Sequence, residues 1–212
     1  MKKYLIVILS MLMMTLSMNN VNALSYKYKK IDYTYHYRGR TFTKYYTKVL
    51  VKGKSKRIKK IRAYLKKIDK RDQTKVNKSM SNAEFRQDSY DWWDKSNVRV
   101  TKNTKSIFSI CRTNDSHFGG VANRDYYGYT FNKKGKKLKL FDVTKGKKAC
   151  VLVSIKNALL KEGINGSSIR NYISHPNKIQ FYVNGHKVYV CISSYEVDQG
   201  TRPIKFALKS KY

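Results

Sequence analysis

Acidic residues are scarce in this chain of 212 residues. Only 13 Asp and Glu residues stand against 46 Lys and Arg residues, which gives a formal net charge of +33. Three of the acids are glutamates, Glu84, Glu162 and Glu196. AT-rich coding favours Lys and Glu alike, so coding bias does not explain the imbalance. A charge this high repels itself and attracts anions, and we therefore expect polyanionic surroundings.

Proline and cysteine are also rare. Two prolines exclude a Pro-rich linker, and the 41% hydrophobic content is enough for a folded core. The three cysteines, Cys111, Cys150 and Cys191, contain no C-x-x-C pair, so neither a zinc site nor thioredoxin-type chemistry is supported. An odd number is a poor disulfide framework. We favour one Cys150–Cys191 disulfide, and the alternative is three small buried thiols.

Long apolar runs are absent after the N-terminus. Residues 1–23 combine two lysines, an apolar run of about 15 residues and a Val-Asn-Ala end, which predicts a signal peptide cleaved after Ala23. A retained membrane anchor is the alternative, although a span needs about 20 apolar residues. We therefore expect residues 24–212 to form one exported domain with no transmembrane anchor.

Hydrophobic periodicity predicts an α+β fold. Antiparallel sheets would be built from hairpins, with two main amphipathic helices packed on one face. The predicted helices cover 54–70 and 147–161, with a short helical turn at 167–173 and some helix around 82–92. Residues 71–96 are otherwise expected to be irregular, and 112–120 to be a loop. The predicted strands are 31–37, 41–51, 98–100, 107–111, 126–131, 138–140, 179–183, 187–191 and 204–208.

The order of several short motifs resembles a known family. The motifs are His117-Phe118-Gly119-Gly120, the aromatic strand 126–131, the lysine-rich turn 134–142, the segment 181–185, and the segment from Val188 to Tyr195-Glu196. Over 117–209 they resemble the extracytoplasmic domain of RsiV-type anti-sigma factors and the region before the PdaC-type deacetylase domain. Residues 24–116 fit the partner region that precedes it. The resemblance implies a fold and a cell-envelope setting.

Lysines dominate the predicted helix 54–70 and form the main candidate site. Such a basic face suits phosphate-rich polymers, because lysine is a flexible point charge. The alternative is a solvated face of an ordinary amphipathic helix, with Asp69 as the only counterweight. The candidate polyanion-binding residues are Lys54, Lys56, Arg57, Lys59, Lys60, Lys66, Lys67 and Lys70.

A second, weaker candidate groups two aspartates with two histidines. Asp115, His117, Asp125 and His186 could converge as a metal or acid–base site, but residues beside glycines often only satisfy backbone groups. The histidines lack the spacing of a deacetylase metal site. We assign no catalytic residue, no metal and no cofactor.

These observations predict a monomeric, non-enzymatic, secreted or wall-associated domain of a Gram-positive-type bacterium. It would bind anionic wall polymers of the teichoic acid type, or another envelope component, through its lysines. Nucleic acid is a possible but not favoured partner. Two alternatives stay open, namely a secreted hydrolase of peptidoglycan or nucleic acid, and a cationic membrane-active effector.

Overall fold

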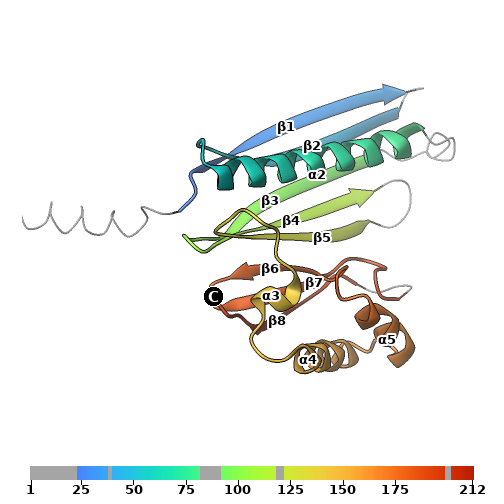
Figure 1. The fold of residues 1–212 in the computed structure, drawn as a ribbon. Coiled ribbons are helices and arrows are strands. Elements are labelled where there is room, and N and C mark those ends of the chain that lie inside the picture. Colours follow the sequence, from blue (N-terminus) through green and yellow to red (C-terminus); the bar gives the residue numbers. More distant parts are fainter. Residues whose placement is uncertain (1–22, 38–39, 82–91, 118–121, 199–201) are drawn as a thin grey trace, which may run out of the picture.

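A computed structural model describes residues 23–37, 40–81, 92–117, 122–198 and 202–212 (Figure 1). The predicted signal segment, apart from Ala23, and almost all of the predicted helix 82–92 lie outside these residues. The described part contains eight strands and four helices. None of these helices is long and apolar enough to cross a membrane.

Five long strands form the first sheet, in the order β1-β2-β3-β4-β5. All neighbours are antiparallel except β2 and β3, which run parallel and are connected through the long helix α2. This pairing makes a β-α-β crossover within a mainly antiparallel sheet. The bounds are β1 Tyr26–Tyr37, β2 Arg40–Val51, α2 Lys56–Ser81, β3 Trp92–Asn103, β4 Ile107–His117 and β5 Asn123–Asn132.

Three shorter strands form the second sheet, in the order β6-β7-β8. Gly185 and His186 form the two-residue turn between β6 and β7, where Asn184 pairs with Lys187. Gly185 has a φ of 54°, which suits the turns that glycine favours. The bounds of the elements in this half are α3 Leu140–Val143, α4 Lys148–Lys161, α5 Gly166–Ser174, β6 Gln180–Asn184, β7 Lys187–Ile192 and β8 Ile204–Lys209.

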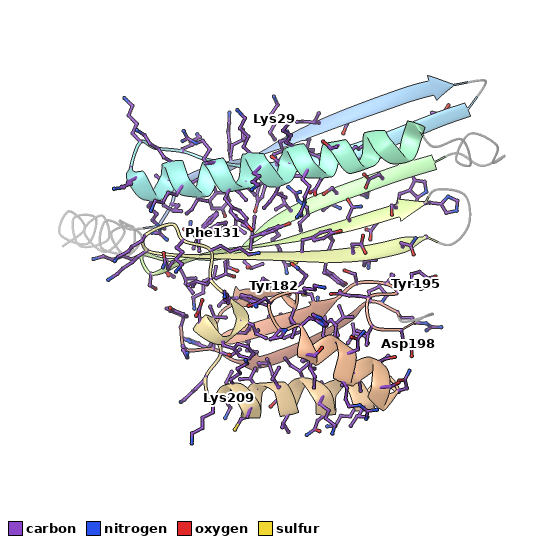
Figure 2. The ribbon with its side chains drawn as sticks, turned by 45° about the vertical axis from the view of Figure 1, so that its right-hand side comes forward. Lys29, Phe131, Tyr182, Tyr195, Asp198 and Lys209 are labelled. Carbon is purple, nitrogen blue, oxygen red and sulfur yellow. The ribbon has the colours of Figure 1, made fainter. Side chains whose placement is uncertain are left out.

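The alternation of side chains along β4 shows how the layers stack. Phe108 and Ile110 point into a core shared with α2, whereas Ile107 points into the core of the second sheet, α4 and α5. Figure 2 shows Phe131 at the level of the first core and Tyr182 where the sheets meet. The first sheet therefore lies between α2 and the second sheet.

Strand β6 crosses the first sheet at short range. The Thr101 hydroxyl in β3 donates to the Val183 carbonyl at 2.8 Å, and the Val183 N–H donates to the buried Ser109 hydroxyl in β4 at 2.9 Å. In β5, a Cβ built on Gly128 would lie 1.6 Å from the Phe181 carbonyl oxygen. Only glycine permits this approach of two backbones.

The structure confirms the α+β class and the mainly antiparallel sheets. Several local expectations differ. Strand β3 already begins at Trp92, within the segment 71–96 that the sequence predicts to be irregular. The two main helices do not share one face. Helix α2 packs on the first sheet and α4 on the second, because each sheet buries its own apolar side chains against one helix. Helix α2 continues past residue 70 to Ser81. Asp72, in this added part, accepts a hydrogen bond from Arg112 of the first sheet. Residues 138–140 form no strand, since only the bridge Phe131–Lys137 precedes α3.

Candidate anion-binding groove

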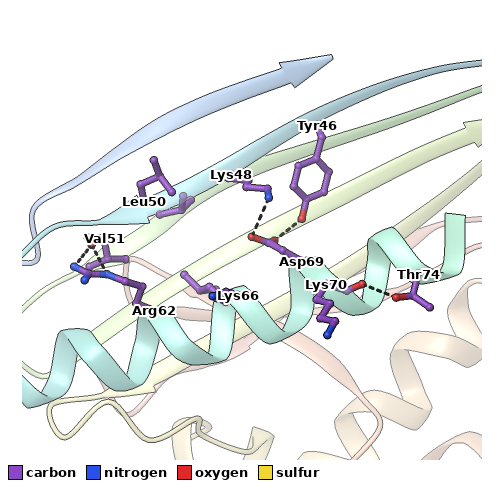
Figure 3. Close-up of a pocket in the computed structure, with 11 residues that line it drawn as sticks. Tyr46, Lys48, Leu50, Val51, Arg62, Lys66, Asp69, Lys70 and Thr74 are labelled. Atoms are coloured by element: carbon purple, nitrogen blue, oxygen red, sulfur yellow. Dashed lines mark hydrogen bonds and ion pairs between the residues drawn. The ribbon is translucent and has the colours of Figure 1, made fainter. Parts of the chain in front are cut away.

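A groove of about 720 Å³ runs between α2 and β2 (Figure 3). Its floor is apolar, with Val49, Val51 and Leu65 buried. Its rim is basic and comes from both elements. The lining residues are Tyr46, Lys48, Val49, Leu50, Val51, Arg62, Leu65, Lys66, Asp69, Lys70 and Thr74.

One wall of the groove is a row of side chains at intervals of four residues along α2. Arg62, Lys66 and Lys70 are exposed and line the groove, and Thr74 continues the row. Residues four apart lie on one helix face, about 6 Å apart along the axis. The row from Arg62 to Thr74 therefore spans about 18 Å.

Arg62 fixes one end of the groove. Its guanidinium donates to the Val51 carbonyl from Nε at 3.3 Å and from Nη2 at 2.9 Å, and also to the Gly53 carbonyl at 2.9 Å. These bonds join α2 to the end of β2 while the charge stays at the surface. The end of the groove is therefore preorganised and positive.

The opposite wall is the β1–β2 hairpin. Lys48 lines the groove, and its side chain is 31% exposed. Lys29 is the cross-strand partner of Lys48, so both side chains lie on the same face of the hairpin. Lys29 is exposed and adds a further positive charge next to the groove.

The one acid in the groove is held toward the protein interior. Asp69 accepts a hydrogen bond from the Tyr46 hydroxyl and one from Arg112 Nη2 at 2.7 Å, and Lys48 Nζ is 3.9 Å from its second oxygen. Arg112 is only 4% exposed and also donates to Asp72. The two acids near the middle of α2 thus pair mainly with a buried cation, and only Lys48 among the lysines that line the groove lies within ion-pair distance of one of them.

The surroundings of Tyr46 and Arg112 keep the protonation states of both side chains fixed. Burial raises the pKa of Tyr46, and the hydrogen bond to Asp69 raises it further, although Arg112 opposes both. Burial lowers the pKa of Arg112, but Tyr46, Asp69 and Asp72 more than offset this and leave it raised. The tyrosine stays neutral and the arginine stays charged across the physiological range.

Most of the predicted basic residues are available to solvent. Lys54, Lys56, Lys59, Lys60, Lys66, Lys67 and Lys70 are all exposed. Arg57 differs, because its guanidinium donates to the carbonyls of Lys105 at 3.0 Å and Thr104 at 3.3 Å. Arg57 therefore holds α2 to the β3–β4 turn.

Sequence reasoning missed Lys29, Lys48 and Arg62 as part of this surface. The four-residue spacing of Arg62, Lys66 and Lys70 was a readable signal for one wall. The position of Lys48 opposite them depends on how the hairpin packs on α2, and local sequence carries no signal for it.

The second candidate site is not assembled. Asp115 lies in β4 and binds Arg124 at 2.5 and 3.2 Å, and His117 stacks on Trp93 with ring centroids 6.3 Å apart. Asp115 and His117 belong to a paired strand rather than to the predicted loop, because β3 and β5 continue beside them.

The remaining two members of that site lie elsewhere. Asp125 points to the opposite face of β5 from Arg124 and accepts from the Tyr127 hydroxyl at 3.3 Å. His186 is in the β6–β7 turn, beside Gly185, whose carbonyl binds Lys102 at the far end of β3. That end is roughly 30 Å from Trp93 along the strand. In the described part of the chain, no three His, Cys, Asp or Glu side chains form a group that could hold a metal ion.

The structure also corrects the predicted disulfide. Cys150 is exposed on α4, whereas Cys191 is buried in β7 against Cys111 of β4. All three are free thiols. Cys150 and Cys191 are therefore not brought together, because α4 presents Cys150 to solvent on the outer side of the second sheet.

No protein-family model and no curated protein matches this sequence. The fold is similar to that of two solved bacterial proteins of the DUF3298 family. One, from Bacteroides fragilis, is 13% identical with a TM-score of 0.60, covering 90% of this chain and 92% of that chain. The other, from Pseudomonas aeruginosa, is 9% identical with a TM-score of 0.54, covering 87% of this chain and 91% of that chain. At these identities the likeness shows that the chain shares the fold of DUF3298 proteins.

Proposed function

We propose that this chain is an exported cell-envelope domain that binds linear, phosphate-bearing polymers of the teichoic acid type in the groove between α2 and β2. The observation that carries the proposal is the row Arg62, Lys66 and Lys70 facing Lys48 across an elongated groove. The proposed role is binding without catalysis.

The shape of the groove favours a chain-like anion over a compact one. Its cations follow one another at about 6 Å intervals instead of converging on a point. Lysine ammonium groups on flexible stems adapt to successive phosphates, whereas a single phosphate is usually held by converging donors. The apolar floor of Val49, Val51 and Leu65 offers contact for the carbon atoms between phosphates.

The proposed location rests on two features of the sequence. Residues 1–23 have the pattern of a signal peptide. The motifs over 117–209 resemble the RsiV- and PdaC-type extracytoplasmic domains, and we propose that the chain is of this type. The fold shared with DUF3298 proteins is compatible with that proposal. A wall rich in anionic polymers would also neutralise the large excess of Lys and Arg over Asp and Glu.

The test compares two triple variants with equal charge. The groove variant carries Lys48→Gln, Lys66→Gln and Lys70→Gln. The matched control carries Lys156→Gln, Lys161→Gln and Lys178→Gln, three exposed lysines in the other half of the molecule. Both lose three charges. Binding of purified wall teichoic acid is measured by titration calorimetry at several salt concentrations, with circular dichroism as the folding check.

We expect the groove variant to bind on the order of 100-fold more weakly, since each of the three lysines near an anionic polymer contributes on the order of 1 kcal/mol. The control should change about threefold or less. Affinity of the unaltered protein should fall steeply with salt. Equal weakening in both variants would show that net charge alone is at work, and salt-insensitive binding would refute an electrostatic groove. Turnover of peptidoglycan or RNA by the protein would contradict the non-enzymatic role.

A further inference from the structure

Two cysteines that are 80 positions apart in the sequence lie side by side between the sheets. Cys111 comes from β4 of the first sheet and Cys191 from β7 of the second. Both are free thiols within one buried cluster, and the Cys191 thiol donates to the Tyr189 carbonyl at 3.8 Å. They belong to a small cluster with Tyr182, which stacks on Tyr189 at 5.1 Å. We call Cys111 and Cys191 the dithiol site.

The two thiols differ in their access to solvent. Cys191 is fully buried, whereas Cys111 is 8% exposed and lines an open hollow of about 310 Å³. Arg99 and Lys205 line the same hollow and are both exposed. A small reagent that enters it therefore meets Cys111 first, in a positively charged setting.

The surroundings also separate the two thiols chemically. The neighbouring Cys191 thiol lowers the pKa of Cys111, burial opposes this, and the charges of Arg99 and Lys205 lower it further. The neighbouring Cys111 thiol and burial raise the pKa of Cys191. The thiolate is the nucleophilic form of cysteine, so Cys111 is the reactive member of the pair.

We propose that Cys111 and Cys191 form a redox-active dithiol that is oxidised by disulfides, with Cys111 as the attacking thiol and Cys191 as the resolving thiol. The Cys111 thiolate attacks one sulfur of an external disulfide, which forms a mixed disulfide and releases one thiolate. Cys191 then loses its proton and attacks the Cys111 sulfur, which releases the second thiolate. The protein loses two hydrogens, and one external disulfide becomes two thiols.

The product would be a covalent link between the two sheets. β4 contacts the second sheet mainly through β6, and the new bond would tie it to β7 as well. Gly128 is the cross-strand partner of Cys111, and its lack of a side chain is what allows the second sheet to come this close. The dithiol site thus lies where the two halves of the molecule are in closest contact.

The test uses oxidised glutathione as the probe. Because Cys150 is exposed on α4, all variants carry Cys150→Ser, which leaves only the two cysteines of the dithiol site. Intact mass is followed with time after quenching with an alkylating reagent. We expect the loss of two hydrogens, no lasting glutathione adduct and no alkylation. Adding Cys191→Ser should leave a stable glutathione adduct on Cys111, and adding Cys111→Ser should slow the reaction at least tenfold.

A measurement on the unaltered chain covers the possibility that a variant misfolds. After oxidation, peptide mapping should recover Cys111 and Cys191 in one disulfide-linked pair, with Cys150 carrying the glutathione adduct. A Cys150–Cys191 or Cys111–Cys150 pair would overturn the proposal. So would glutathione adducts that persist on Cys111 in the presence of Cys191, or a Cys111→Ser variant that reacts as fast as the Cys191→Ser variant.

Discussion

Replacing Gly128 with alanine should separate the two sheets. The added Cβ would lie 1.6 Å from the Phe181 carbonyl oxygen and 2.2 Å from its carbonyl carbon, while at least 3.0 Å is needed. The atoms that must yield belong to two paired backbones, so no side chain can rotate out of the way. Strand β6 must move by about 1.4 Å or the first sheet must bend.

The energetic cost follows from what this movement disturbs. Overpacking costs about 1–3 kcal/mol, and a shift of this size also strains the three hydrogen bonds that join β6 to the first sheet, each contributing about 1 kcal/mol. Those bonds use Thr101, Ser109 and the Gly128 N–H. We expect the free energy of unfolding to fall by roughly 3–6 kcal/mol.

Urea unfolding followed by tryptophan fluorescence and circular dichroism measures this loss. Gly166→Ala is the matched control, because its Cβ would meet nothing closer than Arg170 at 3.8 Å and it lies in the first turn of α5. Alanine should leave stability unchanged or raise it by up to about 1 kcal/mol there. If Gly128→Ala unfolds within 1 kcal/mol of Gly166→Ala, the close approach of the two sheets is wrong.

Three further predictions concern buried charges and tyrosines. Arg112→Met should lower the free energy of unfolding by about 3–5 kcal/mol in chemical denaturation, because it leaves two inward acids without their cation. Lys44→Met should be destabilising alone, whereas Lys44→Met with Asp94→Leu should be near neutral, since both members of this pair are about 2% exposed; a destabilised double variant would contradict this. Burial raises the pKa of Tyr129 to about 12, above the ordinary value of 10. The unfolded state therefore loses its phenolic proton first as pH rises, and Tyr129 should contribute a fall in stability of about 2 kcal/mol between pH 10 and 12, as checked by urea unfolding at each pH.

Local patterns were sufficient for the elements that depend on neighbours in sequence. The Asn184-Gly185 pair between alternating runs predicted the β6–β7 hairpin, and the apolar spacing of Ile58, Ile61 and Leu65 predicted the first half of α2. The second half of α2 is polar, and it carries no comparable periodic signal. Its helical structure is supported by tertiary contacts, since Asp69 and Asp72 bind Arg112 of the first sheet.

Contacts between distant segments were beyond local patterns. The parallel pairing of β2 with β3 joins strands that α2 separates in the chain, so no hairpin turn sequence between them predicts the pairing. The neighbouring positions of Cys111 and Cys191 depend on the register of two sheets, so counting cysteines favoured the wrong pair. The groove was half predictable, because one of its walls is a periodic row on a helix and the other is a hairpin packed across it.

The direction in which Asp69 points changes the charge of α2 as a binding surface. In the sequence, Asp69 is the only acid among the lysines of 54–70 and reduces their total. In the fold, its carboxylate accepts hydrogen bonds from Tyr46 and Arg112, and Arg112 is almost fully buried. The buried Arg112 offsets most of that acid within the protein, although Lys48 also lies 3.9 Å from it. A polymer on the outer face therefore meets Lys66 and Lys70 with little opposing charge. Asp69→Asn should therefore strengthen polymer binding only slightly at constant salt while destabilising the fold, whereas an acid that opposed the lysines at the surface would give a large gain in affinity and little loss of stability.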